Sequence, residues 1–217
     1  MPTILQSVAM TTYGSGTTAT RTFASACTPG SRIVAIATQE NQAGTFTISD
    51  PTNGTYADDS TGAGGTGVSG SGAATIRSVA NTASTALTVT LTLGTATYGT
   101  FTVYELSDAV FDAGTTGLGG VATAFTGSLT AVASAFGFAI GTLYPAGASV
   151  DTSYTAAFAE TGIANAYHFG EYNSNLGSAG TKTVTFNLGS PDSWSLAFAT
   201  YKSAGGGGDT LWAQACL

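Results

Sequence analysis

Two stretches of this chain, Thr88–Ala109 and Thr183–Ala204, carry the same pattern 95 residues apart. Aligned without gaps, both begin Thr-Val-Thr, share a Leu-Gly pair and end in Ala. In the first stretch, apolar residues alternate with threonines on either side of a Gly-containing segment; they are Val89, Leu91, Leu93, Phe101 and Val103. This period of two turns one face of a strand to a core and the other to water. Each stretch therefore predicts a β-hairpin, and their repetition predicts one fold built from two similar halves.

The composition favours strands over helices along the whole chain. Only 8% of the residues are charged, against about 25% in ordinary soluble domains. Helix-forming Glu, Lys, Gln and Arg are scarce, while Thr, Val, Tyr and Phe are plentiful. About a dozen short strands separated by turns are typical of a sandwich. We therefore predict an all-β fold, an antiparallel, jelly-roll-like β-sandwich with a surface covered by hydroxyl groups.

Several segments of this sandwich can be placed from the sequence. Residues 3–38 predict about three strands. The last of them, Ser31–Thr38, is apolar on both faces, as a central strand is, and Ser134–Leu143 has a similar alternation. The Gly- and Ser-rich segment Asp58–Gly72 predicts a surface loop. The second half is expected to start after Asp112–Gly120.

The composition of the chain changes near its end, which predicts a sandwich domain over residues 1–204 and an arm over residues 205–217. Gly205–Gly208 reads as a flexible spacer. The apolar residues after it are candidate interface anchors: Leu211, Trp212, Cys216 and Leu217. Such an arm docks on a neighbouring subunit, folds back on its own sandwich or stays disordered, and the sequence leaves these alternatives open.

Charge and hydropathy exclude several classes of protein. The net charge is −7 and the five basic residues are scattered, which argues against nucleic-acid binding. No run of apolar residues is long enough for a transmembrane helix. The segment MPTILQSVAM lacks the pattern of a secretory signal. Cys27 and Cys216 do not make a disulfide framework; two separate thiols are expected, and a bond between them is the alternative.

No constellation of catalytic or metal-binding residues is evident. His168 is the single histidine and no G-x-S-x-G elbow occurs, so we expect a packed or surface histidine. The acidic residues lack the spacing of a calcium loop and predict solvated turns; they are Asp58, Asp59, Asp108 and Asp112. Gly62–Gly67 matches G-x-G-x-x-G only by composition, because no helix is expected after it. The sequence therefore predicts a protein that is not an enzyme and needs no cofactor or metal.

Aromatic side chains give one alternative function, the binding of carbohydrate. Exposed aromatic rings can stack on sugars, as in lectin-like sandwiches. The candidates are Tyr98, Tyr144, Tyr167, Tyr172 and Trp194. The simpler interpretation makes each of them a core or rim aromatic.

The order of these signals resembles a β-sandwich module of phage structural proteins and bacterial surface proteins. The resemblance rests on four segments: Ser31–Thr38, Asp50–Tyr56, Thr88–Asp108 and Trp194–Tyr201. It implies a fold and a structural or binding role, and supplies no catalytic residues. We therefore expect a non-enzymatic virion protein, most simply a capsid decoration protein on the head surface. Its partners would be capsid or tail proteins and further copies of itself. The alternative is a carbohydrate-binding or adhesive module on a phage tail or a bacterial cell surface.

Overall fold

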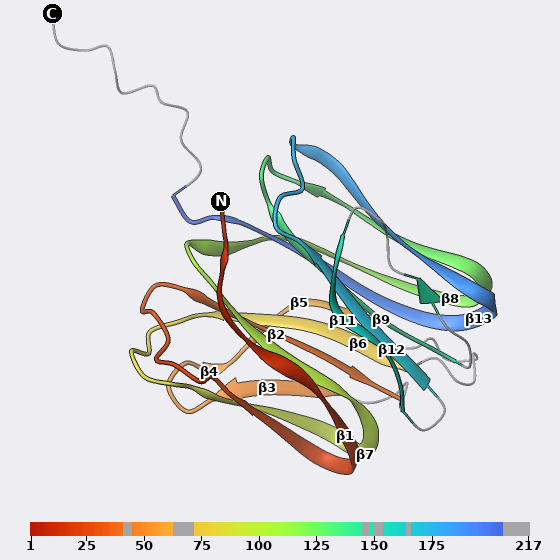
Figure 1. Cartoon of the computed structure of the whole chain (residues 1–217), viewed down its shortest axis with the longest axis horizontal. Coiled ribbons are helices and arrows are strands. Elements are labelled where there is room, and N and C mark those ends of the chain that lie inside the picture. The colour runs from red at the N-terminus through yellow and green to blue at the C-terminus, as the bar shows by residue number, and fades with distance from the viewer. Residues whose placement is uncertain (41–44, 63–71, 145–147, 150–153, 164–165, 206–217) are drawn as a thin grey trace, which may run out of the picture.

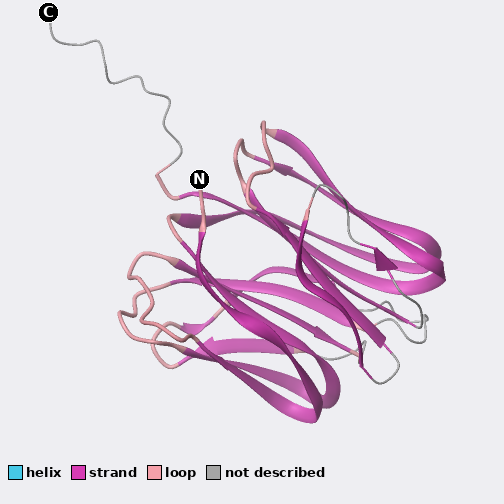
Figure 2. Ribbon diagram, in the orientation of Figure 1, coloured by secondary structure: helices cyan, strands magenta, loops and turns pink. Residues whose placement is uncertain are grey.

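The computed structural model describes residues 1–40, 45–62, 72–144, 148–149, 154–163 and 166–205 (Figure 1). These residues form strands and loops, with no helix among them (Figure 2). The first half of the chain makes one sheet, from β1 (Ile4–Thr22), β2 (Arg32–Gln39), β3 (Phe46–Asp50), β4 (Gly54–Thr55), β5 (Ala57–Gly62), β6 (Ala73–Ala80) and β7 (Thr88–Leu106). The second half makes the other, from β8 (Ala109–Ala131), β9 (Phe136–Tyr144), β10 (Ala148–Ser149), β11 (Thr155–Ile163), β12 (Ala166–Asn173) and β13 (Gly180–Ser203). The pairings are antiparallel, which confirms the predicted all-β sandwich.

The two sheets have the same connectivity. In each, the long last strand (β7 or β13) pairs along one edge with the long first strand (β1 or β8). On its other edge, β7 pairs with β2 and β3, and β13 pairs with β9 and β10 in the same way. Each sheet then continues outward, through β6 to β5 or through β12 to β11. The two halves are therefore structural repeats, as the sequence pattern predicts.

The predicted hairpins are wrong, because β7 and β13 each run as one long strand. In β7 the apolar residues before and after the Gly-containing segment have the same parity, so they stay on one face and enter one core cluster. What changes at this segment is the partner, from β3 around Leu91 to β2 from Gly99 onward. A side chain at Gly99 would overlap the Thr38 carbonyl of β2, so this position suits glycine.

Other expected boundaries also need correction. The first two strands expected within residues 3–38 are the single strand β1, and the expected separator Asp112–Gly120 lies inside β8. The first part of the expected loop Asp58–Gly72 belongs to β5. β1 and β8 pair along most of their length with β7 and β13. Cross-strand hydrogen bonds thus hold the Gly-containing parts of these strands, whose own strand propensity is weak.

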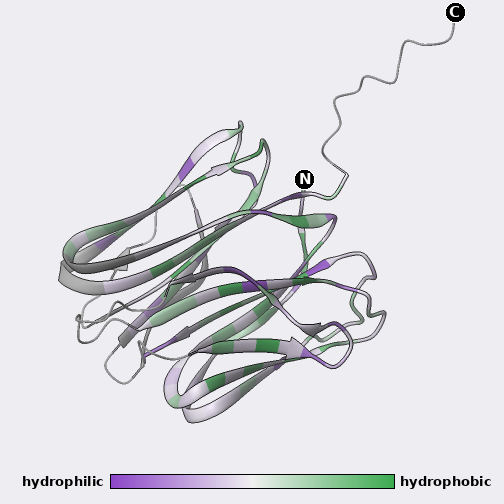
Figure 3. Ribbon diagram, turned by 180° about the vertical axis from the view of Figure 1, so that it is seen from behind, coloured by the Kyte–Doolittle hydropathy of each residue, from purple (hydrophilic) through white to green (hydrophobic). Residues whose placement is uncertain are grey.

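Apolar side chains form three clusters, one inside the curve of each sheet and one between the sheets. Apolar and polar residues alternate as green and pale bands along the ribbons (Figure 3). The cluster between the sheets takes Val34, Ile36, Ala74, Ile76, Tyr104 and Leu106 from the first sheet. From the second sheet it takes Phe136, Phe138, Ile140, Ala197, Ala199 and Tyr201. The later part of β7 is consequently buried on both faces, and the sheets share one core.

Hydrogen bonds from β5 also join the first sheet to the second. The buried carboxylate of Asp59 accepts hydrogen bonds from the Ser78 hydroxyl and from the Tyr201 hydroxyl of β13, the latter at 2.6 Å. The Ser60 hydroxyl accepts a hydrogen bond from the Phe198 amide at 3.1 Å and donates one to the Thr115 carbonyl at 2.6 Å. It thus bridges β13 and β8, and the two sheets form one structural unit.

Candidate functional site

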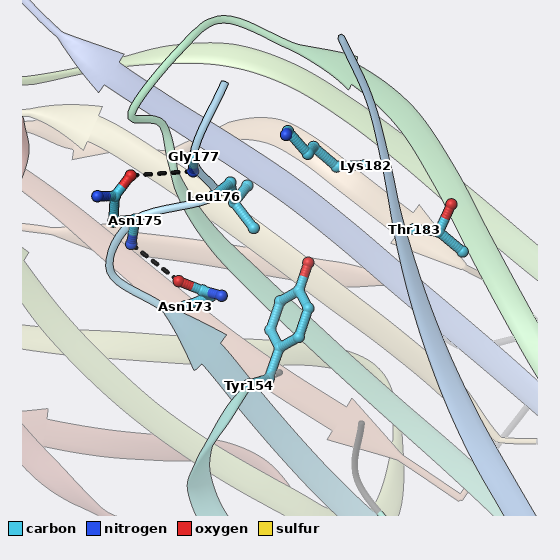
Figure 4. A pocket seen from close by; sticks show the side chains of 7 residues that line it. All are labelled: Tyr154, Asn173, Asn175, Leu176, Gly177, Lys182 and Thr183. Atoms are coloured by element: carbon cyan, nitrogen blue, oxygen red, sulfur yellow. Dashed lines mark hydrogen bonds between the residues drawn. The ribbon is translucent and has the colours of Figure 1, made fainter. Parts of the chain in front are cut away.

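A pocket lies at one end of the second sheet, where three separate segments meet (Figure 4). It is bordered by the residue before β11, the loop after β12 and the start of β13. Its volume is about 260 Å³, and its lining residues are Tyr154, Asn173, Asn175, Leu176, Gly177, Lys182 and Thr183. Asn175, Gly177 and Thr183 are exposed, so the pocket opens to solvent.

The loop on one side of the pocket is held by two successive Asx turns. The Asn173 side-chain oxygen accepts a hydrogen bond from the Asn175 amide at 2.9 Å, and the Asn175 side-chain oxygen accepts one from the Gly177 amide at 2.9 Å (Figure 4). Gly177 has φ of 75°, a left-handed conformation that favours glycine. The Leu176 amide donates to the Ala135 carbonyl at 2.9 Å, which fastens the loop to the β8–β9 connection. The wall is therefore built before any ligand arrives.

The opposite side of the pocket offers an aromatic ring and a cation. The Tyr154 ring packs edge-on against Phe198, with the ring centroids 6.3 Å apart. Lys182 extends from the start of β13 toward the same space (Figure 4). The Thr183 hydroxyl is hydrogen-bonded to Ser128 across the ribbon at 3.0 Å. The residues lining the pocket include no carboxylate, imidazole or thiol. The arrangement thus suits recognition of a ligand and provides no general acid–base pair.

The structure does not bring together the tyrosines predicted to stack on sugars. Tyr98 is exposed and lies in the first sheet. Tyr167 packs against the cluster inside the second sheet, whereas Tyr172 packs against the cluster between the sheets and stacks on Phe136 at 5.6 Å. These two residues differ in parity along β12, so they point to opposite faces. Tyr144 ends β9, and its side chain lies outside the described residues.

The remaining aromatic candidate, Trp194, is a core residue. It is buried and stacks on Phe125, with the ring centroids 4.6 Å apart. The simpler interpretation, a core aromatic, is confirmed for this residue.

Sequence reasoning missed the residues that line the pocket. Asn173, Asn175 and Gly177 give a turn signal that indicates a rigid loop, but not what the loop faces. Lys182 is one of only five basic residues, which is the second available signal. Their proximity to Tyr154 depends on how β11, β12 and β13 are arranged in the sheet, which no local pattern encodes.

The acidic residues predicted as solvated turns divide into two groups. Asp108 is exposed in a turn, as predicted, whereas Asp58 is exposed but lies in β5. The prediction is wrong for Asp59, which is buried between the sheets, where burial raises the pKa of its carboxyl group. It is also wrong for Asp112, whose side chain is 8% exposed and pairs with Lys202 at 3.4 Å. β8 continues through Asp112, so this residue does not lie in a turn.

The histidine and the described cysteine are core residues that do not join a group of metal ligands among the described residues. His168 is fully buried, and Cys27 is a buried thiol. Within the described ranges, no three His, Cys, Asp or Glu residues gather as metal ligands, and no helix is long and apolar enough to span a membrane. The sandwich strands end at Ser203. The candidate anchors of the arm lie outside the described residues, as does most of the Gly-rich match at Gly62–Gly67; the anchors are Leu211, Trp212, Cys216 and Leu217.

Comparison of the chain with protein-family models, curated proteins and solved structures finds no match.

Proposed function

We propose that this protein is a non-enzymatic structural component of a virion, a decoration protein of a phage head that acts through protein–protein contacts. The observation that supports this most directly is the surface of the two long ribbons, β1–β7 and β8–β13. Their exposed threonines and serines pair across the strands, as Thr22 does with Thr88 at 2.9 Å and Ser128 with Thr183 at 3.0 Å. A surface of this kind can be covered by a partner without removing many charges from water.

The physical argument rests on the cost of desolvation. Moving an ionised side chain out of water costs much more free energy than moving a hydroxyl group out of water. Charged residues are accordingly depleted at the centres of protein interfaces. Only 8% of this chain is charged. Part of this charge is already held inside the fold, so even less remains for the surface. Among the described residues, the carboxylates with little or no exposure are those of Asp50, Asp59, Glu105, Asp112 and Glu171. In a symmetric shell the same low cost would recur at every copy.

The test is to count this chain in the particle. Particles of the phage that encodes this chain should be purified, and the amount of the chain relative to the major shell protein should be measured by quantitative mass spectrometry. We expect many copies per particle, at a ratio unchanged by a second density gradient. Absence of the chain from purified particles would overturn the proposal, and a few copies per particle would favour a place on the tail instead.

A carbohydrate-binding or adhesive module of a phage tail or bacterial surface is the second proposal. The observation that favours it is the pocket beside Tyr154, which combines an aromatic ring, side-chain amides and a cation. Apolar walls with a few well-placed polar groups are the usual composition of small-molecule sites. The candidate site for this function is therefore the pocket, in place of the tyrosines predicted from the sequence.

A further inference from the structure

Lys182 stands apart from the other basic residues of the chain because it has no partner among the residues that the structure describes. All five lie among the described residues, and four of them donate hydrogen bonds or form ion pairs. Arg21 donates to the Phe101 carbonyl at 3.3 Å, Arg32 to Ser78 at 2.8 Å, Arg77 to Asp58 at 3.1 Å, and Lys202 pairs with Asp112 at 3.4 Å. Lys182 makes no hydrogen bond or ion pair among the described residues, and it is the one that borders the pocket. A cation held at a pocket without a partner is available for an anionic group of a ligand.

The walls beside Lys182 suit a small ring with apolar faces and hydroxyl groups. The ring of Tyr154 and the side chain of Leu176 both border the space (Figure 4). Asn175 uses its side-chain oxygen within the loop, which leaves its NH₂ group as a donor toward solvent at the edge of the pocket. The Asx turns hold this amide in place, so little conformational entropy is lost on binding.

We infer, on the basis of the carbohydrate-binding proposal above, that this pocket binds one residue of an acidic saccharide, with the sugar carboxylate on the Lys182 ammonium group. The volume of about 260 Å³ is below the usual range of about 300–1,000 Å³ for drug-sized ligands, which limits the occupant to a single ring. A phosphate group is less well matched, because sites for phosphate usually combine several donors in a backbone nest or an arginine fork. Since the pocket opens to solvent, neighbouring sugars can continue outside it.

The experiment compares acidic and neutral oligosaccharides on matched lysine variants. Wild-type protein, Lys182→Gln and Lys202→Gln are titrated by NMR or calorimetry with trigalacturonate and with galactotriose, its uncharged counterpart. Lys202 is the other lysine of the chain and its ion pair with Asp112 lies outside the pocket, so this variant controls for the loss of one positive charge. We expect trigalacturonate to bind wild type and Lys202→Gln alike. We expect Lys182→Gln to bind it about fivefold more weakly or worse, as is typical of one lost, partly exposed ion pair.

Each other outcome would overturn the inference. If wild-type protein bound the two trisaccharides with equal affinity, the sugar carboxylate would play no part in binding. If Lys182→Gln and Lys202→Gln lost the same affinity for trigalacturonate, the effect would come from the net charge of the protein and not from the pocket. Acetate binding as tightly as trigalacturonate would leave a carboxylate site without sugar recognition. Failure of both trisaccharides to bind would end the saccharide assignment. The virion proposal would survive any of these results, because it depends on the presence of the chain in particles.

Discussion

Phe138→Ala is expected to lower the free energy of unfolding by about 3–5 kcal/mol, the range for truncating a fully buried phenylalanine. Phe138 lies in β9 at the centre of the cluster between the sheets and has no exposed surface. Its ring contacts four other aromatic rings, those of Tyr104, Phe136, Tyr172 and Tyr201, with centroids 4.8–6.2 Å apart. Tyr104 comes from the first sheet, so the cavity would open where the two halves meet. Urea denaturation followed by tryptophan fluorescence and by circular dichroism measures the loss.

A matched control is Phe111→Ala, on β8. Phe111 is 36% exposed, and its ring packs edge-to-face with the Tyr201 ring, with the ring centroids 6.3 Å apart. Its truncation should cost about 1 kcal/mol. Both variants should unfold in one transition, because the sheets share a core and the hydrogen bonds of β5. Two separate transitions, with only one moved by Phe138→Ala, would contradict the single structural unit described above.

Acid is expected to destabilise the protein through His168, by about 3 kcal/mol at full effect. His168 is fully buried on β12, and neither ring nitrogen has a hydrogen-bond partner in the described part of the chain. Burial lowers the pKa of this imidazole from 6.5 to about 4. Between these two values the unfolded chain binds a proton and the folded chain does not, so stability is complete above pH 6.5 and falls as the pH decreases toward 4. Each tenfold change in proton affinity is worth about 1.4 kcal/mol, which gives the stated total.

His168→Leu isolates this effect, because the chain has a single histidine. Free energies of unfolding measured in urea at pH 7 and pH 4.5 should fall by about 2 kcal/mol more in wild type than in the variant. The carboxylates titrate in both proteins and cancel in the comparison. If the two proteins lost equal stability between pH 7 and pH 4.5, His168 would not be buried in its neutral form.

The sequence predicted the class of the fold and its duplication because both depend on side-chain parity. Thr88–Ala109 and Thr183–Ala204 alternate with the period of a strand, and they form the equivalent strands β7 and β13. The same parity also argues against the predicted turn, since it continues unbroken from Leu93 to Phe101. Glycine between two alternating segments is typical of a turn, although glycine in a strand also marks close approach of another backbone, as it does at Gly99.

The burial of Asp59 and the pocket could not be predicted, because both depend on contacts between distant segments. Asp59 reads as part of a polar, Gly-rich loop, whereas its carboxylate finds its partners inside the core in Ser78 and Tyr201, which are both distant in the sequence. The pocket joins Tyr154, the Asn173–Gly177 loop and Lys182, which lie on separate segments around three strands. Local patterns specify strands and turns, whereas a site of this kind is specified by the order of strands in the sheet.

The measurement that tests the central claim most directly is reconstitution of a particle. Particles produced without this chain are mixed with the purified protein, and bound copies and the temperature of genome release are recorded. A decoration protein should bind to saturation at a fixed ratio to the shell protein and raise the release temperature, because binding stabilises the state that is bound. Particles that take up none of the protein, or that bind it with no change in release temperature, would contradict the proposed stabilising role.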